Sequence, residues 1–395
     1  MRVPLIDNYE KFVEFNNELK SDTRSIINIQ SIDYDRSRIW IDTNTTSLDL
    51  DKFLQTFVTN QSIYITTNIK LLEDYDFSRL YSQTHPEEFK TNLYDYAKNL
   101  TLIGETTFML WDFTVEILSD GLAISKYVGS KARNHLVIPF GITEIGKFTF
   151  NLADWLKEIE LPTTLKKISF RAFADSSLKR VVIPDSVEFI DKGAFISCSN
   201  LRQVELPKNL KSIGMLAFAD TSITEIKLPN TLARLEAGVF ADCRELTKVE
   251  LPNELQEIGT KVFSGTNLKS VEIPDTTYII DSRAFSYCHK LRNVKLPNRL
   301  QTIGLSAFTN TNIAEINIPE SVRFIGYGAF SNCKRLDKVN LPTVLENVGA
   351  NAFSNTPIEK AIDKKLKIAL RNSKSSKIKR LADYFLGNKG ARWIL

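Results

Sequence analysis

Residues that carry catalytic chemistry are scarce in this chain. It contains three histidines among 395 residues, at His85, His135 and His289, and their sequence contexts are unrelated. None stands at a recognisable spacing from a cysteine or a carboxylate, and the chain has no HExxH, no CxxC and no glycine-rich phosphate loop. We therefore expect no catalytic residues, no metal site and no cofactor.

Long apolar runs are also missing. No stretch approaches the ~18–20 residues that a membrane-spanning helix needs. The first residues, Met1 to Asp7, turn polar and acidic at once, without the basic and apolar regions of a secretion signal. A cytoplasmic location is therefore expected, with a non-classical surface or virion location as the alternative. The sequence does not indicate the oligomeric state.

Charge is distributed unevenly along the chain. The net charge is +4, but residues 1–120 carry 11 Lys/Arg against 20 Asp/Glu, whereas residues 364–395 carry 10 against one. The segment between is close to neutral. An acidic beginning and a basic end favour a protein with partners, or contact between its two ends, over an enzyme.

Four cysteines reveal an internal period. They lie at 198, 243, 288 and 333, which is 45 residues apart each time. Ten phenylalanines and ten prolines follow the same rhythm in steps of 22 and 23 residues. The phenylalanines are Phe150, Phe173, Phe195, Phe218, Phe240, Phe263, Phe285, Phe308, Phe330 and Phe353. A repeat of this length indicates a solenoid of about ten turns.

Each unit has a simple physical interpretation. Leu201, Val204 and Leu206 alternate with polar residues, as a short strand with one buried face does. Pro207 ends the strand because it has no N–H for the ladder. We expect Gly214 to allow a tight bend before Phe218, which packs in the core. One unit cannot bury its apolar face alone, so the phenylalanines are predicted to form a column of core residues in stacked turns.

This pattern resembles the BspA-like class of leucine-rich repeats over about residues 113–362, with Phe113 to Gly129 similar to the hairpin that caps such arrays. The resemblance implies an α/β fold: a leucine-rich-repeat solenoid of short parallel strands, with non-enzymatic binding or adhesion as its usual role. We expect a small N-terminal α/β domain at 1–110, the capped solenoid at 111–362, and a basic helical C-terminal cap or tail at 363–395.

The flanking segments are less readable. Residues 1–110 resemble no family that we recognise, and their patterning predicts alternating helices and strands. Helices are expected at 5–20, 47–58, 69–81 and 86–99, and strands at 25–32, 38–43 and 62–67. Two acidic pairs, Asp33/Asp35 and Asp49/Asp51, have donors for a cation, although such pairs are common on acidic surfaces. In the tail, helices are predicted near 358–370 and 378–386.

The cysteines are not predicted to form disulfides. Successive cysteines lie two turns apart, about 9.6 Å at a strand spacing of ~4.8 Å. A disulfide needs Cα atoms within about 7 Å. In the alternate units the same position holds a serine or threonine, such as Ser176 or Thr221. A small, partly buried residue at a corner is therefore the favoured interpretation.

The open strand face is where a solenoid usually binds. The residue before each strand is basic in five of nine turns, and a second column mixes signs, so a cross-strand charge ladder is the alternative to a recognition surface. The candidate binding residues are Lys179, Arg180, Arg202, Lys227, Lys248, Lys269, Arg292 and Lys295. No aromatic residue occupies these columns, which disfavours a stacking platform.

The sequence is compatible with three hypotheses of function. The leading hypothesis is a non-enzymatic scaffold that binds a protein partner. The second is a nucleic-acid- or virion-associated protein that docks through its basic tail, whose cations could neutralise phosphates. Those cations are Lys364, Lys365, Lys367, Arg371, Lys374, Lys377, Lys379 and Arg380. The third is a small enzymatic or toxin domain in residues 1–110.

Overall fold

The structure of the chain is a computed structural model. It describes residues 86–362 except 103, 111, 133 and 344, and three short strands before residue 42. The chain divides into two compact units. The described part of the first unit is residues 86–129 with 139–143 and the three short strands, and that of the second is 130–138 with 144–362. We describe each unit by itself.

In the first unit a helix precedes an antiparallel meander. Helix α4 (Pro86–Leu102) buries one face, because Leu93, Ala97 and Leu100 recur at helical spacing. Strands β4 (Thr107–Leu110), β5 (Phe113–Leu118) and β6 (Gly121–Tyr127) then pair in order. The helix predicted at 86–99 and the hairpin predicted from residue 113 are therefore confirmed.

The same unit contains a small antiparallel sheet near the N-terminus. Its order is β1–β3–β2, formed by β1 (Arg2–Val3), β2 (Ile29–Asp33) and β3 (Arg38–Ile41). Strand β3 coincides with the strand predicted at 38–43, and β2 overlaps the one predicted at 25–32. The helices predicted at 5–20, 47–58 and 69–81 and the strand at 62–67 lie outside the described residues. The domain limits at 110 and 362 stay predictions.

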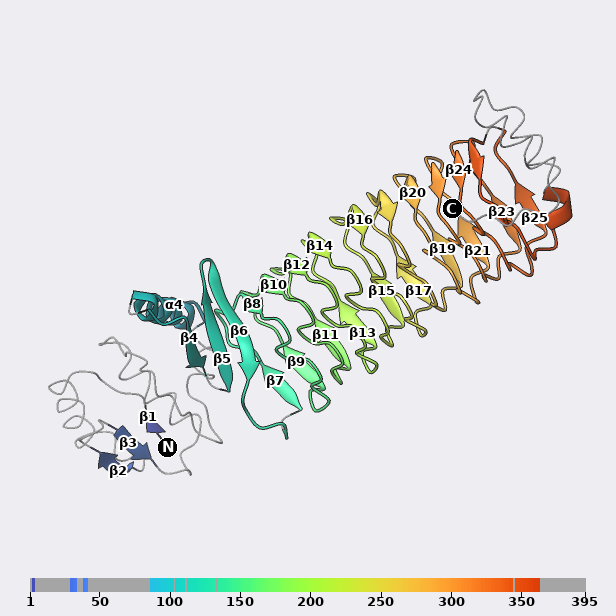
Figure 1. Cartoon of the computed structure of the whole chain (residues 1–395). Helices are drawn as coiled ribbons and strands as arrows, with labels where there is room; N and C mark the ends of the chain where they lie inside the picture. The colour runs from blue at the N-terminus through green and yellow to red at the C-terminus, as the bar shows by residue number, and fades with distance from the viewer. Residues whose placement is uncertain are drawn as a thin grey trace. The chain divides into compact units, whose positions relative to one another are not determined.

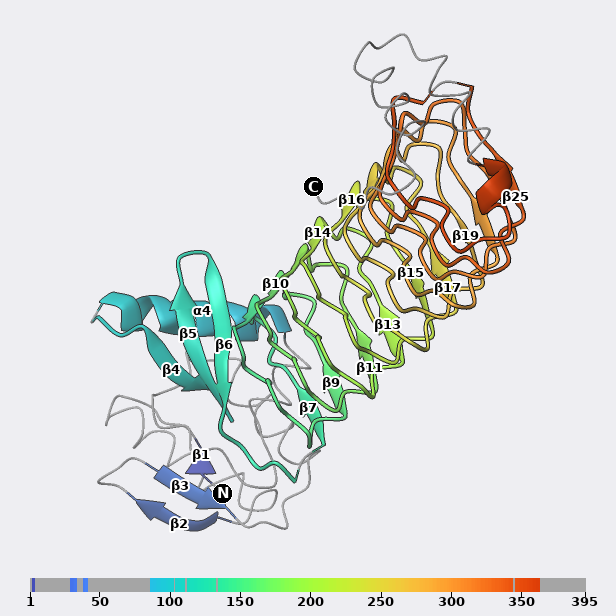
Figure 2. The same ribbon diagram turned by 45° about the vertical axis from the view of Figure 1, so that its right-hand side comes forward.

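The second unit is a solenoid whose stacked turns carry two rows of short strands (Figures 1 and 2). We call the row that contains the second apolar residue of the Leu-x-x-Val motif, as in Leu201 to Val204, the strand wall. The row that precedes the Ala-Phe motif, as in Ala217 and Phe218, is the second wall. The strand wall consists of β7 (His135–Val137), β9 (Glu158–Glu160), β11 (Arg180–Val182), β13 (Gln203–Glu205), β15 (Glu225–Lys227), β17 (Lys248–Glu250), β19 (Ser270–Glu272), β21 (Asn293–Lys295), β23 (Glu315–Asn317) and β25 (Lys338–Asn340).

The second wall is made of two-residue strands that pair in parallel. They are β8 (Glu144–Ile145), β10 (Lys167–Ile168), β12 (Phe189–Ile190), β14 (Ser212–Ile213), β16 (Arg234–Leu235), β18 (Glu257–Ile258), β20 (Ile279–Ile280), β22 (Thr302–Ile303), β24 (Phe324–Ile325) and β26 (Asn347–Val348). The predicted solenoid of short parallel strands is therefore confirmed.

The strand wall is divided into two-stranded sheets. Pairing joins β7 to β9, β11 to β13, β15 to β17, β19 to β21 and β23 to β25. Each pair spans a step of 23 residues, as in Val181 opposite Val204. The extra residue of a 23-residue turn stands just before its strand, ahead of the leucine and, in four of the five turns, after the cysteine. Because strands of this wall pair only across the 23-residue steps, the alternation of turn lengths groups the turns into pairs.

The phenylalanine column is the centre of the core. All ten rings predicted for it are buried, with 0–3% of each residue exposed. Neighbouring ring centroids lie 5.0–5.8 Å apart and the ring planes are nearly parallel. The backbone repeats the stacking, since the Phe218 amide donates to the Val239 carbonyl at 3.0 Å. The prediction that these residues form the core is confirmed.

The tight bends lie beside the Ala-Phe motif and not at the preceding glycine. Leu216 and Asp220, on either side of Phe218, have positive φ of 58° and 56°. Gly214 does not adopt a positive φ, so its expected role in the bend is wrong. A Cβ on Gly214 would lie 2.4 Å from the Lys192 backbone nitrogen in the turn before. This glycine allows close stacking of turns.

Polar side chains join the turns at the corner after the proline. The Lys208 amide donates to Asp185 Oδ1 at 2.9 Å, and the Ser186 hydroxyl donates to the Leu165 carbonyl at 2.7 Å. The same pair of contacts recurs every 45 residues. The later acceptors and hydroxyl donors are Asn230 with Thr231, Asp275 with Thr276, and Glu320 with Ser321. Backbone groups at this corner are thus satisfied between turns.

A helix begins at the C-terminal end of the described part of the solenoid. Residues 359–362 are helical, Ile362 is fully buried, and its amide donates to the Ile358 carbonyl at 2.8 Å. This agrees with the start of the helix predicted near 358. The rest of the predicted C-terminal cap lies outside the described residues. No helix that the structure describes is long and apolar enough to span a membrane.

Removing one ring from the phenylalanine column should destabilise the solenoid strongly. Phe240 is fully buried, with ring centroids 5.8 Å from Phe218 and 5.7 Å from Phe263. We expect Phe240→Ala to lower the free energy of unfolding by about 3–5 kcal/mol, measured by chemical denaturation. The matched control is Phe324→Ala, because Phe324 is 44% exposed. An equal effect of both substitutions would contradict the importance of the column.

Candidate functional site

The eight candidate residues of the strand wall occupy three positions and are all exposed. Four stand immediately before a strand: Lys179, Arg202, Lys269 and Arg292. Two begin a strand, Arg180 in β11 and Lys248 in β17, and two end one, Lys227 in β15 and Lys295 in β21. The structure thus separates a column that precedes the strands from residues within the strands.

The four candidates within the strands are engaged in ion pairs. Lys227 Nζ lies 3.6 Å from Glu250 Oε2 in the paired strand, and Lys248 Nζ lies 2.9 Å from Glu250 Oε1. Hydrogen bonds from Lys248 and the charges of both lysines lower the pKa of Glu250. Arg180 contacts Glu205 in the same way, and Lys295 contacts Glu272. For these four candidates, the expected charge ladder therefore forms as separate groups, two pairs and one group of three around Glu250.

The four candidates before the strands have no such partner. Within the part of the chain that the structure describes, neither an ion pair nor a side-chain hydrogen bond engages Lys179, Arg202, Lys269 or Arg292. Lys157, one turn earlier, is in the same condition. We call these five residues the free basic column.

The free basic column has two runs. Its members adjoin through the backbone, since the Lys179 amide donates to the Lys157 carbonyl at 3.1 Å and the Arg202 amide to the Lys179 carbonyl at 3.0 Å. The Arg292 amide likewise donates to the Lys269 carbonyl at 3.0 Å. Thr224 and Thr247 separate the two runs. The column therefore presents two positive patches along one line.

The sequence placed all eight basic residues on one candidate surface and gave a charge ladder along the mixed-sign column as the alternative. It did not show which strands pair, and so which of these cations are neutralised. The alternating steps of 22 and 23 residues were the signal that could have shown which strands pair. The paired strands are 23 residues apart, and they carry the cross-strand ion pairs Arg180–Glu205, Lys227–Glu250 and Lys295–Glu272.

The four cysteines are buried free thiols. They are more buried than the partly buried corner that we expected, with 0% exposed. Cys243 Sγ donates to the Phe218 carbonyl at 3.0 Å and lies 3.2 Å from the Thr221 hydroxyl, which itself donates to Phe218. The other cysteines likewise donate to a phenylalanine carbonyl and lie against a hydroxyl of the turn before. Their partners are Ser176 for Cys198, Thr266 for Cys288 and Thr311 for Cys333.

Burial makes these thiols unreactive. It raises the pKa of Cys198, Cys243 and Cys288 to about 11, and it raises the pKa of Cys333 as well. The thiolate is the nucleophile and metal ligand, so such groups are poor candidates for redox or metal chemistry. The cysteines therefore belong to the core of the two-turn unit.

The other candidate groups do not assemble into a site. His135 Nε2 lies 2.9 Å from Glu160 Oε1 across β7 and β9, and His289 contacts the edge of Tyr287. Among the described residues no cluster of three His, Cys, Asp or Glu could hold a metal ion. His85, Asp35, Asp49 and Asp51 lie outside the described residues, as do all the basic tail residues from Lys364 to Arg380.

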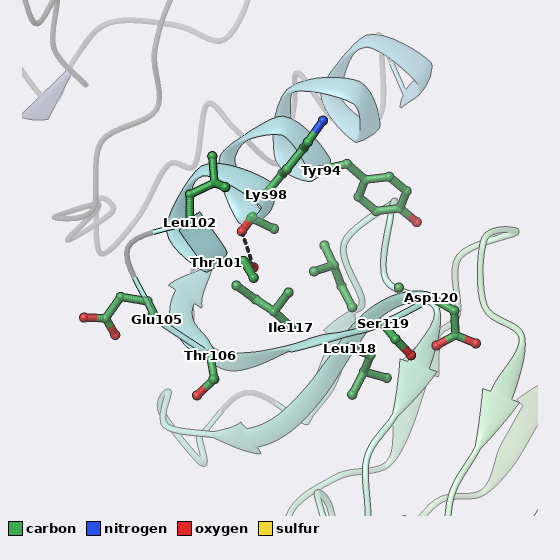
Figure 3. A pocket seen from close by; sticks show the side chains of 13 residues that line it. Tyr94, Lys98, Thr101, Leu102, Glu105, Thr106, Ile117, Leu118, Ser119 and Asp120 are labelled. Atoms are coloured by element: carbon green, nitrogen blue, oxygen red, sulfur yellow. Dashed lines mark hydrogen bonds between the residues drawn. The ribbon is translucent and has the colours of Figure 1, made fainter.

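The first unit has a hollow of about 560 Å³ between α4 and the hairpin of β5 and β6 (Figure 3). Ala97, Ile117 and Leu122 supply apolar lining. Glu105 and Asp120 lie at opposite ends of the hollow, so its carboxylates do not converge. A catalytic pocket is expected to bring polar groups together. The hollow therefore lends no support to an enzymatic domain in residues 1–110.

Comparison with known families agrees with this repeat geometry. The sequence profile described as "BspA type Leucine rich repeat region" matches in six copies, over residues 124–247, 166–292, 213–334 and 256–372. The matched residues make up more than half of the chain. No curated protein matches the sequence.

Several solved bacterial structures are similar to the chain. A leucine-rich repeat protein from Bacteroides ovatus is 22% identical, with 63% of this chain and 92% of that chain covered and a TM-score of 0.37. The T. pallidum leucine-rich repeat protein is 24% identical, with 57% and 88% covered and a TM-score of 0.41. A leucine rich cell surface protein from Faecalibacterium prausnitzii is 20% identical, with 64% and 93% covered and a TM-score of 0.35.

The buried thiols should be detectable by their reactivity and by pH. All four are expected to resist iodoacetamide in the folded chain at pH 8 and to react after denaturation without reductant. An unfolded thiol titrates near pH ~8.5, whereas burial raises the pKa of Cys198, Cys243 and Cys288 to about 11 and also raises that of Cys333. Their contribution to stability is therefore complete below pH ~8.5 and is lost as the pH rises through 11.

The matched control replaces all four cysteines by threonine, the residue found at the same place in most of the alternate turns, such as Thr221. Thermal unfolding measured from pH 8 to pH 11 should show a smaller loss of stability in this variant than in the native chain. Fewer than four reactive thiols after denaturation, or identical pH profiles, would overturn this interpretation.

Proposed function

The chain belongs to the BspA-type leucine-rich repeat family, and from this premise we propose that it is a non-enzymatic scaffold that binds a protein partner along the strand wall. The observation that carries the proposal is the contrast between neutralised and free cations on that wall. Arg180, Lys227, Lys248 and Lys295 are occupied by carboxylates of their own solenoid. The free basic column is available to a partner.

A surface of this kind suits an acidic protein. Complementary charge raises the rate of encounter and selects the partner, while exposed ion pairs contribute little to the stability of the fold. The rigid stacking of turns holds Lys179 beside Arg202 and Lys269 beside Arg292 without further ordering. A pre-formed surface loses less entropy on binding than a flexible one does.

A cytoplasmic location is proposed, with a non-classical surface or virion location as the alternative. The domain limits at residues 110 and 362 are proposed as well. Docking of nucleic acid or a virion through the tail, Lys364 to Arg380, is the competing hypothesis. The binding experiment that follows separates it from the scaffold.

Neutralising the free basic column should weaken partner binding and leave the fold intact. We expect the change of Lys179, Arg202, Lys269 and Arg292 to serine to slow association and to flatten its dependence on salt, measured by surface interferometry with a partner identified by pull-down and mass spectrometry. The thermal midpoint should stay unchanged, because exposed charges are worth about 0–1 kcal/mol.

Two controls make the result specific. Changing Arg180, Lys227, Lys248 and Lys295 to serine removes the same charge from the same wall, but from residues that are already paired. Changing Lys364, Lys365, Lys367 and Arg371 removes it from the tail. If the tail variant abolished capture while the column variant retained it, the strand wall would not be the binding surface and the competing hypothesis would replace the scaffold.

A further inference from the structure

A second line of free polar groups follows the corner between the phenylalanine column and the strand wall. In the long turns two residues stand between the cysteine and the following leucine, and in the last three of these turns they are Arg244 and Glu245, His289 and Lys290, then Lys334 and Arg335. In the short turns between them one residue stands there, and it is Asn267 or Asn312. We call residues 267, 289, 290, 312, 334 and 335 the corner ridge.

The members of the corner ridge are neighbours in space. The Asn312 amide donates to the Leu291 carbonyl at 3.0 Å, directly after Lys290. Thr266 contacts Cys288, and Thr311 contacts Cys333, so Asn267 and Asn312 follow residues that stack against the long turns. Long turns recur every second turn. Pairs of residues that contain at least one lysine or arginine therefore alternate with asparagine amides along the ridge.

These side chains are exposed or half-buried and are not engaged by the solenoid. Among the described residues, no ion pair or hydrogen bond involves the side chain of Asn267, Lys290, Asn312, Lys334 or Arg335. The beginning of the same corner is different, because Asn200 donates to the Ser177 hydroxyl at 3.5 Å and Ser222 donates to the Ser199 carbonyl. Free donors thus accumulate toward the C-terminal turns, where the charge also becomes positive.

From this pattern we propose that the corner ridge binds a linear sulfated polysaccharide. Ammonium and guanidinium groups pair with sulfates, and asparagine amides between them hydrogen-bond sugar hydroxyls. In such a ligand, anionic groups and hydroxyls alternate along an extended chain. On the ridge, cations and amides alternate in the same way. This inference concerns residues outside the free basic column and does not depend on the proposed protein partner.

Other polyanions fit the ridge less well. A protein partner is usually anchored by aromatic or apolar residues at the centre of its interface, and the ridge supplies only charged and polar side chains. Single-stranded nucleic acids bind through rows of aromatic rings on which successive bases stack. The ridge offers the His289 ring alone, and that ring already contacts Tyr287. A sulfated polysaccharide needs neither anchor nor stacking row.

The buried thiols are compatible with such a ligand. Sulfated polysaccharides occur outside cells, where exposed cysteines tend to oxidise. The four cysteines are fully buried and their pKa is raised, so they are protected from oxidation. Binding of this ligand would favour the surface location among the proposed alternatives.

The test is titration calorimetry of the full chain with a heparin-derived oligosaccharide at physiological salt. We expect Lys290→Ser, Lys334→Ser and Arg335→Ser together to weaken binding by at least about tenfold and to flatten its salt dependence. The control changes Lys227, Lys248 and Lys295 to serine, which removes equal charge from paired residues, and should retain the affinity. Both sets are also measured after Lys364, Lys365, Lys367 and Arg371 are changed to serine, which removes binding by the tail.

Comparison ligands decide the chemistry. Asn267→Ala with Asn312→Ala should weaken heparin binding but leave binding of polyglutamate unchanged, because polyglutamate has charge and no hydroxyls. Equal losses in the ridge and control sets would show a general charge effect and overturn the proposal. So would absence of heparin binding in the native chain, or stronger binding of polyglutamate or a DNA duplex through the same ridge residues. Partner capture by the free basic column tests the proposed function separately.

Discussion

The stacking of phenylalanine rings in alternating long and short turns is the constraint on which the rest of the solenoid depends. The rings lie 5.0–5.8 Å apart, close to the ~4.8 Å spacing of hydrogen-bonded strands, so one spacing satisfies both the core and the walls. The alternation decides what each turn adds. The long turn brings a cysteine whose thiol donates to the phenylalanine carbonyl of the turn before, beside a serine or threonine of that turn. The structural unit is therefore a pair of turns, one long and one short, that together contain 45 residues.

The same alternation shapes the surface. Strands pair across the 23-residue steps, and the cross-strand ion pairs of the strand wall form across those steps too. Among the described residues, Lys179, which stands before a strand, and Lys290, which lies in the corner ridge, form no ion pair. Neutralised and free charges are thus separated by position within the repeat and not by overall composition. Binding surfaces of this solenoid are expected where the internal pairing stops.

Much of the solenoid could be predicted from its sequence because each column repeats ten times. The spacing of the phenylalanines identified the core, and the Leu-x-x-Val motif identified the strand wall. The role of Gly214 was misjudged, since close approach of backbone from the previous turn does not show in one unit. Ion pairing in the column of Lys227 was expected only as an alternative to a recognition surface, because the sequence does not show which strands are joined. Residues 1–110 have no repeat to average over, so their patterning remained weak.

A pair of deletions tests the two-turn unit most directly. Removing residues 219–263 takes out 45 residues and joins equivalent positions, so short and long turns still alternate. Removing residues 219–240 takes out one turn of 22 residues and places the Cys243 turn directly after the Cys198 turn, without Thr221 between them. Thermal unfolding of both proteins gives the answer. The two-turn unit predicts a lower midpoint for the smaller deletion, although that protein keeps more turns. A midpoint equal to or higher than that of the larger deletion would show that the turns are interchangeable and would contradict the two-turn unit.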